Sequence, residues 1–85
     1  LVFNYAFSER NPMLNLTIYD SNARVVNRLI RNKSAGLAGE VIWDGRNEQG
    51  ALCPSGIYIY QSEIHTSEGH YQQFKGSFVL IDAGK

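Results

Sequence analysis

Apolar and polar residues alternate along most of this chain, with a period of two instead of the 3.6 expected of a helix. The stretch LNLTIY at 14–19 shows the pattern clearly, with leucine or isoleucine at every even position. Such alternation is typical of a strand with one buried face. Segment 23–32 is the only serious helix candidate, but its β-branched residues and flanking turns favour a strand. The chain is therefore expected to be all-β.

Clusters of turn residues divide the chain into six or seven short strands. DSNA at 20–23 is a turn cluster that makes 13–30 a hairpin, whereas RNKSAGLAG at 31–39 is interpreted as a polar link. Gly76 interrupts the last strand, which predicts a bulge there. Strands are expected at 1–7, 13–19, 24–30, 40–43, 56–66 and 70–81. This spacing predicts a small antiparallel β-sandwich of immunoglobulin-like or fibronectin III-like architecture.

Size and charge limit the classes of function. The 85 residues form one domain, 1–85, and eight Lys plus Arg balance eight Asp plus Glu. A neutral chain lacks the strongly basic surface that would attract nucleic acids or anionic membranes. It also has no apolar run of about 18 residues, the length that a membrane-spanning helix needs. Because it begins at Leu1 without a signal segment, we expect it to be a fragment of a larger protein.

The single cysteine, Cys53, excludes an internal disulfide and any zinc site built from several cysteines. We interpret Cys53 as a small, partly buried apolar residue in a turn. A reactive or intermolecular thiol is the alternative.

The sequence WDGRNEQG at 43–50 resembles a ligand loop at first sight. A calcium loop needs oxygen ligands at alternate positions. Two positions after Asp44, where the next ligand should be, the sequence has the cation Arg46. A phosphate cradle needs glycine amides that lead into a helix, whereas this segment leads to Pro54 and then a strand. A structural corner is the better interpretation.

The corner interpretation assigns a structural task to each characteristic residue. Trp43 caps one end of the core, and its indole N–H reaches a backbone carbonyl. Asp44 accepts hydrogen bonds from the loop backbone, as Asx turns do. Gly45 and Gly50 supply positive φ angles. Pro54 and Gly56 begin the next strand, on which Tyr58 and Tyr60 pack on one face.

Two histidines near a hairpin tip are the candidate metal ligands. If a four-residue loop closes this hairpin, His65 and His70 lie opposite each other, with Glu63 and Gln72 as the next pair. Two exposed histidines that serve only solubility are the simpler interpretation. We therefore expect no resident metal or other cofactor.

Aromatic residues offer a second ligand hypothesis, a platform for a sugar ring. Packing in a thin core is the favoured alternative. Catalytic groupings are weaker still, because no nucleophile-elbow serine or suggestive Cys–His spacing exists. We expect no enzymatic activity. The candidate platform residues are Tyr19, Trp43, Tyr58, Tyr60 and Tyr71.

The order of these motifs resembles the immunoglobulin-like domain of the flagellar hook-capping protein family. LTIYDSNARVVNRLI, the WDGRNEQG corner, SGIYIY and FKGSFVLI follow one another as they do in that family. Ala23 departs from the pattern, which has a turn glycine there, and Asn22 is expected to take the positive φ in its place. The matching residues are Ile18, Tyr19, Asp20, Val26, Leu29, Gly36, Trp43, Asp44, Gly45, Gly50, Gly56, Tyr58, Lys75, Val79 and Leu80.

The resemblance implies a non-catalytic domain at the C-terminus of an exported bacterial protein, located in the periplasm, on the cell surface or outside the cell. Its role would be that of a spacer, assembly or protein-interaction module. Its partners would be neighbouring domains or secretion machinery, without nucleic acid or membrane insertion. A looser resemblance, carried by Asn11, Pro12 and Lys75, is to the sorting and anchoring domains of type IX secretion. A small carbohydrate- or metal-binding module is the third hypothesis.

Overall fold

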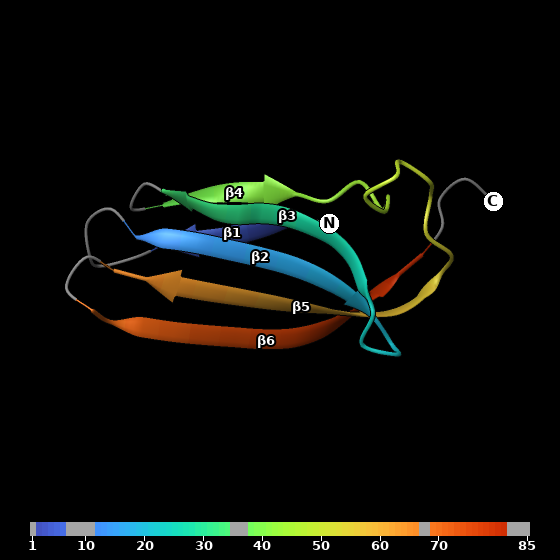
Figure 1. The fold of residues 1–85 in the computed structure, drawn as a ribbon. Coiled ribbons are helices and arrows are strands. Elements are labelled where there is room, and N and C mark those ends of the chain that lie inside the picture. The colour runs from blue at the N-terminus through green and yellow to red at the C-terminus, as the bar shows by residue number, and fades with distance from the viewer. Residues whose placement is uncertain (1, 7–11, 35–37, 67–68, 82–85) are drawn as a thin grey trace.

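The chain folds into two antiparallel sheets in this computed structural model, which describes residues 2–6, 12–34, 38–66 and 69–81 (Figure 1). The described residues contain six strands and no helix, so the predicted all-β sandwich is confirmed. The strands are β1 (Val2–Ala6), β2 (Met13–Asp20), β3 (Val25–Ser34), β4 (Ala38–Ile42), β5 (Gly56–His65) and β6 (Tyr71–Leu80).

The larger sheet has the strand order β3-β2-β5-β6, and β1 pairs with β4 to form the smaller one. The predicted hairpin at 13–30 is confirmed, since β2 and β3 are antiparallel neighbours. Leu14, Leu16 and Ile18 are all buried, whereas the intervening residues of β2 are partly exposed. The period of two therefore identified the inner face of the larger sheet correctly.

The core between the sheets is centred on Ile18, Trp43 and Tyr58, with Cys53 at its end. The Trp43 and Tyr58 rings meet edge to face, with centroids 5.6 Å apart. Phe78 on β6 lies against both rings, at 5.7 Å and 6.1 Å. Edge-to-face and offset contacts are the arrangements that aromatic quadrupoles favour. A separate cluster of Leu14 and Ile64 fills the other end of the larger sheet.

Three turns share one hydrogen-bonding pattern. In each, the first residue donates its N–H to the carbonyl four residues later, and its own carbonyl accepts from the third residue after it. The side-chain oxygen of the first residue accepts a hydrogen bond from the backbone N–H of the residue four positions later. The residue three positions on has a positive φ, as in hairpin loops that end in a bulge. The turns begin at Asp20, Asn47 and Thr66, and the positive φ falls on Ala23, Gly50 and Gly69.

Three local predictions were wrong. Most of the expected polar link at 31–39 belongs to strands, because β3 continues to Ser34 and β4 begins at Ala38. Gly76 makes no bulge, since the β5–β6 register is continuous across it. Ala23 itself has the positive φ, 64°, that was expected at Asn22. The register shifts of the larger sheet instead lie between β2 and β3.

Some predictions fall outside the described residues. The first strand was expected at 1–7, and only Val2–Ala6 of it is described. Gly36 and Asn11, which took part in the two family resemblances, are likewise outside the described ranges.

Candidate functional site

The corner at 43–53 is the most characteristic feature of the chain, and its first residues turn the backbone as predicted. Trp43 is 2% exposed, and its indole Nε1 donates to the carbonyl of Arg46 over 2.9 Å. The carboxylate of Asp44 accepts the N–H of Arg46 over 3.1 Å, which makes an Asx turn. Gly45 has a φ of 82° and packs beneath Leu80. The burial of the indole and these backbone bonds confirm the structural corner.

A small hairpin lies inside the corner, where Arg46 and Leu52 form an isolated antiparallel bridge. The side-chain oxygen of Asn47 accepts the N–H groups of Gln49 and Ala51, both over 3.0 Å. Arg46 donates through Nη1 to the carbonyl of Gly50 over 2.8 Å. The guanidinium that argued against a calcium loop therefore holds the hairpin closed.

Glu48, at the tip of this hairpin, binds the edge of β3. Its N–H donates to the carbonyl of Val26, and its carboxylate accepts the N–H of Arg28, both over 3.2 Å. The same carboxylate pairs with the side chains of Arg28 at 3.1 Å and Arg31 at 2.6 Å. The backbone hydrogen bond from Arg28, followed by the Arg31 guanidinium, lowers the pKa of Glu48. The corner thus covers part of an edge strand that would otherwise be open to pairing.

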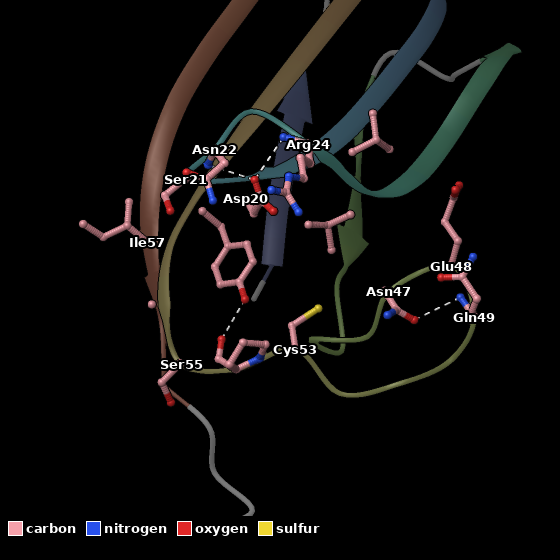
Figure 2. A pocket seen from close by; sticks show the side chains of 15 residues that line it. Asp20, Ser21, Asn22, Arg24, Asn47, Glu48, Gln49, Cys53, Ser55 and Ile57 are labelled. Atoms are coloured by element: carbon pink, nitrogen blue, oxygen red, sulfur yellow. Dashed lines mark hydrogen bonds between the residues drawn. The ribbon is translucent and has the colours of Figure 1, made fainter.

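A cavity of about 480 Å³ lies between this corner and the β2–β3 turn (Figure 2). At its base the hydroxyl of Tyr58 donates to the carbonyl of Pro54 over 2.7 Å, and Cys53 lies beside them. Asp20, on the opposite side, accepts the N–H groups of Asn22 and Arg24 over 2.9 Å and 3.0 Å. The polar side chains that line the cavity thus include several that already hold the adjoining turns.

The Cys53 thiol and the Tyr58 hydroxyl in the cavity are both shifted toward their neutral forms. Burial raises the pKa of the Cys53 thiol, and burial likewise raises the pKa of the Tyr58 hydroxyl. Cys53 is buried, as its interpretation as a small apolar residue anticipated. Since a thiolate is the reactive form of cysteine, this setting disfavours nucleophilic chemistry at Cys53.

The proposed histidine pair is not formed as expected. His65 lies opposite Tyr71, not His70, and Glu63 lies opposite Gln73 instead of Gln72. The cause is the turn that begins at Thr66, which shifts the pairing by one residue and places neighbouring positions on opposite faces. The rings of His65 and Tyr71 lie 4.7 Å apart.

Glu63 is engaged by the same tyrosine. The Tyr71 hydroxyl donates to the Glu63 carboxylate over 2.9 Å, and this hydrogen bond raises the pKa of Tyr71. Within the part of the chain that the structure describes, no group of three or more His, Cys, Asp or Glu residues is arranged to hold a metal ion.

The proposed aromatic platform is divided between the two faces of the larger sheet. Trp43 and Tyr58 are buried in the core, and Tyr60 packs against it. Tyr19 and Tyr71 lie on the outer face, but Tyr19 pairs with Ile59 whereas Tyr71 pairs with His65, six residues farther along β5. These five rings therefore do not form one flat surface for a sugar.

An apolar patch on the outer face of the larger sheet was not predicted. The register pairs Tyr19 with both Val25 and Ile59, and it pairs Ile57 with Val79. Val25 is 41% exposed, Ile57 59% and Val79 67%. Val25 and Ile57 also line the cavity, and Figure 2 shows the Ile57 side chain pointing away from Cys53. We call Tyr19, Val25, Ile57, Ile59 and Val79 the outer patch.

The sequence did contain a signal for this patch. GIYIY and FVLI are apolar at consecutive positions, so both faces of β5 and β6 are apolar near that end of the sheet. A half-buried strand with one face in water would alternate instead. Continuous apolar runs in an antiparallel sheet therefore indicate a second covered or interacting face.

No helix among the described residues is long and apolar enough to cross a membrane. Comparison of the chain with protein-family models, with curated proteins and with solved structures finds no match.

Proposed function

We propose that this chain is a non-catalytic accessory domain that docks onto neighbouring polypeptides through its outer patch. The observation that carries the proposal is the gathering of Val25, Ile57 and Val79, each more than 40% exposed, around Tyr19 and Ile59. Contiguous exposed apolar surface is uncommon on isolated soluble domains and is characteristic of interaction sites. The patch contains no charged residue, which suits the apolar core of a protein interface, where charged residues are depleted.

The organisation of the corner supports assignment to the immunoglobulin-like domains of the flagellar hook-capping protein type. Trp43 is buried, Asp44 caps the turn, and Gly45 and Gly50 adopt positive φ angles. The hydroxyl of Tyr58, near the start of β5, bonds the carbonyl four residues upstream, which is the tyrosine corner of immunoglobulin-like sandwiches. Residues that carry the resemblance thus have structural roles, so a domain that shares them shares an architecture. Export in a bacterial host is part of the proposal.

The chemistry of the cavity supports a non-catalytic role. Its thiol and its phenol are both shifted toward their neutral forms. The carboxylate of Asp20 is already an acceptor for two backbone N–H groups, and Glu48 is paired with two arginines. General acid–base catalysis needs a group that is free to exchange a proton with a substrate.

Site-specific photo-crosslinking in the full-length protein, expressed in its native host, tests the docking role. A photoreactive amino acid replaces Val79 in the outer patch, and a matched variant carries it at Gln73 on the same face of the same strand. We expect one discrete intramolecular or intermolecular product at position 79 and none at 73. Equal labelling at both positions, or none at 79, would contradict a docking role for the patch.

A second experiment separates docking from type IX sorting. Residues 1–85 are fused to the C-terminus of a reporter that carries its own export signal, in a host with type IX secretion. An accessory domain leaves the reporter in the periplasm, whereas a sorting domain moves it to the cell surface. Surface display that survives the paired changes Ile57→Thr and Val79→Thr would favour sorting over docking.

A further inference from the structure

One residue attaches the tip of the corner hairpin to the larger sheet. Residues 47–50 and β3 both lie within the described part of the chain, and every hydrogen bond between them is made by Glu48. The other hydrogen bonds of the tip close the hairpin on itself, since the side chain of Asn47 accepts the N–H groups of Gln49 and Ala51. The tip can therefore move away from β3 without breaking its own hydrogen bonds.

Glu48 occupies backbone groups that a neighbouring strand would use. β3 is an edge strand, because it pairs with β2 alone in the order β3-β2-β5-β6. The N–H of Glu48 donates to the carbonyl of Val26, and its carboxylate accepts the N–H of Arg28, both over 3.2 Å. A strand paired with this edge would make the same two kinds of contact through its backbone alone. Glu48 is thus an internal substitute for one residue of a partner strand.

The surroundings of this edge select an acidic residue. The guanidinium groups of Arg28 and Arg31 bind the Glu48 carboxylate at 3.1 Å and 2.6 Å, and their side chains are 48% and 67% exposed. A guanidinium has five N–H donors, so one carboxylate leaves donors of both arginines open to solvent. A cavity of about 310 Å³ adjoins them, and its charged lining residues are Arg28, Arg31, Arg46, Asp44 and Glu48. Three cations against two anions give this lining a net charge of +1.

We propose that this edge of β3 binds an extended segment of another polypeptide that carries a glutamate, and that Glu48 is an internal competitor that keeps the site closed. The incoming glutamate repeats the contacts of Glu48, with its N–H on the carbonyl of Val26 and its carboxylate on Arg28 and Arg31. The site shares no residue with the outer patch. This inference therefore goes beyond the proposed docking function and does not depend on it.

Displacement of Glu48 is energetically accessible. Ion pairs between exposed side chains stabilise weakly, and the three charged groups of this contact lie at the surface. While Glu48 is bound, the apparent affinity for a partner is reduced in proportion to the fraction of molecules in which the site is open. A peptide also adds backbone hydrogen bonds along the edge, as in other cases of strand addition. A free anion has no backbone N–H for Val26, so the peptide is the better ligand.

The probe is a fluorescently labelled, capped peptide with one central glutamate between threonines, and its binding to the full chain is followed by fluorescence anisotropy. Glu48→Gln should lower Kd at least about threefold, because it removes the competing charge and preserves the size of the side chain. Glu40→Gln, at an exposed residue of β4, makes the same change in net charge and should leave Kd unchanged. Circular dichroism establishes that both variants are folded.

Two altered peptides test the two contacts of the incoming residue. Replacement of the central glutamate by glutamine removes the charge that the arginines recognise. Methylation of its backbone nitrogen removes the donor to the carbonyl of Val26. Each change should raise Kd of the Glu48→Gln protein at least about fivefold, since charge-assisted and edge hydrogen bonds are both lost from a small interface.

The arginine contact is tested in the Glu48→Gln background, because in the parent protein a loss of Arg31 weakens the internal competitor and the site alike. There Arg31→Gln should raise Kd at least about fivefold. Arg24→Gln is the matched control. It makes the same charge change just before β3, at a residue that has no hydrogen bond or ion pair with Glu48 in the structure, and should have no effect.

Amide hydrogen exchange in the unmodified protein gives an independent test that needs no variant. At saturating peptide the N–H of Glu48 loses its acceptor and should exchange at least about fivefold faster. The N–H of Arg28 passes from one carboxylate to another and should remain protected. The N–H of Gln49, which is bonded within the hairpin, should not change.

Binding that is unchanged or weakened by Glu48→Gln would overturn the proposal, because Glu48 would then not compete for the site. Equal binding of the glutamine peptide would overturn it as well, and so would displacement of the peptide by inorganic phosphate at matched ionic strength, which would indicate a general anion site. Failure of the Val79 crosslink would leave all of these measurements unaffected. A failure at β3 and a failure of the outer patch are therefore distinguishable.

Discussion

The ring of Tyr60 lies directly over the backbone of Gly76 on the neighbouring strand. The two residues are opposite each other in the β5–β6 register, and a Cβ at position 76 would lie 2.6 Å from both Cε1 and the hydroxyl oxygen of Tyr60. The ring is also fixed by Phe3 and Phe78, whose centroids lie 5.3 Å and 6.5 Å away. Glycine at this position is therefore a requirement of aromatic packing.

The substitution Gly76→Ala should lower the free energy of unfolding by about 1–3 kcal/mol, because the tyrosine ring must move against its aromatic neighbours. Urea unfolding measures the change. Ser77→Ala, on the other face of the same strand, is the control and should stay within about 0.5 kcal/mol. In a Tyr60→Leu background the cost of Gly76→Ala should largely disappear, and an undiminished cost there would refute the steric explanation.

Trp43→Ala should cost roughly 3–5 kcal/mol of stability, as the removal of a large buried aromatic side chain does. The indole is 2% exposed, contacts Tyr58 and Phe78, and satisfies the carbonyl of Arg46. Leu52→Ala, a change in the same corner at a residue that is 57% exposed, is the matched control. The free energy of unfolding is measured by thermal and urea unfolding. If that of Trp43→Ala lay within about 0.5 kcal/mol of the value for the parent protein, the corner would be independent of the core.

Local patterns predicted the strands and the corner well because their causes are local. Alternation at 14–19 identified the buried face of β2, and the indole hydrogen bond of Trp43 followed from the need of a buried N–H for an acceptor. The Asx turn at Asp44 involves only Asp44 and the two residues that follow it. Each of these features depends on a few neighbouring residues, so the amino-acid sequence is sufficient to predict them.

Features that depend on pairing between strands were missed. The histidine hypothesis assumed a four-residue loop, and the hydrogen bond from Thr66 to His70 instead shifted the register by one residue. Gly76 was interpreted as a bulge because the sequence does not reveal which side chain lies opposite a glycine. The outer patch was missed for the same reason, since Ile57 and Val79 become neighbours only through the β5–β6 register.

Ala23→Gly should stabilise the protein by about 0.5–1 kcal/mol, because an alanine in the left-handed region is strained by its Cβ. Ala23 has a φ of 64° in the turn that begins at Asp20, where the two equivalent turns have Gly50 and Gly69. Differential scanning calorimetry measures the expected rise in Tm. Asn22→Gly is the matched control, since Asn22 does not have a positive φ and its replacement should give no gain. A lower Tm for Ala23→Gly would indicate that unfolded-chain entropy outweighs the relief of strain.

Glu48 should make the stability of the protein depend on pH in the acidic range. Its folded-state pKa is lowered from 4.5 by the backbone N–H of Arg28 and then by Arg31. A depressed pKa means that the unfolded state binds the proton more readily, so the contribution of Glu48 is fully present above its unfolded pKa. That contribution is lost as the pH falls through the lower, folded-state value.

The difference in unfolding free energy between the parent protein and Glu48→Gln should therefore be larger at pH 7 than at pH 3, as measured by urea unfolding at each pH. Because the side chains of Arg28 and Arg31 are 48% and 67% exposed, added salt should reduce the difference at pH 7 by screening their pairs with Glu48. The hydrogen bond to the Arg28 N–H is short-range and should survive salt, so a residual difference is expected. A difference that stays constant between pH 3 and pH 7 would show that the carboxylate charge does not hold the corner against β3.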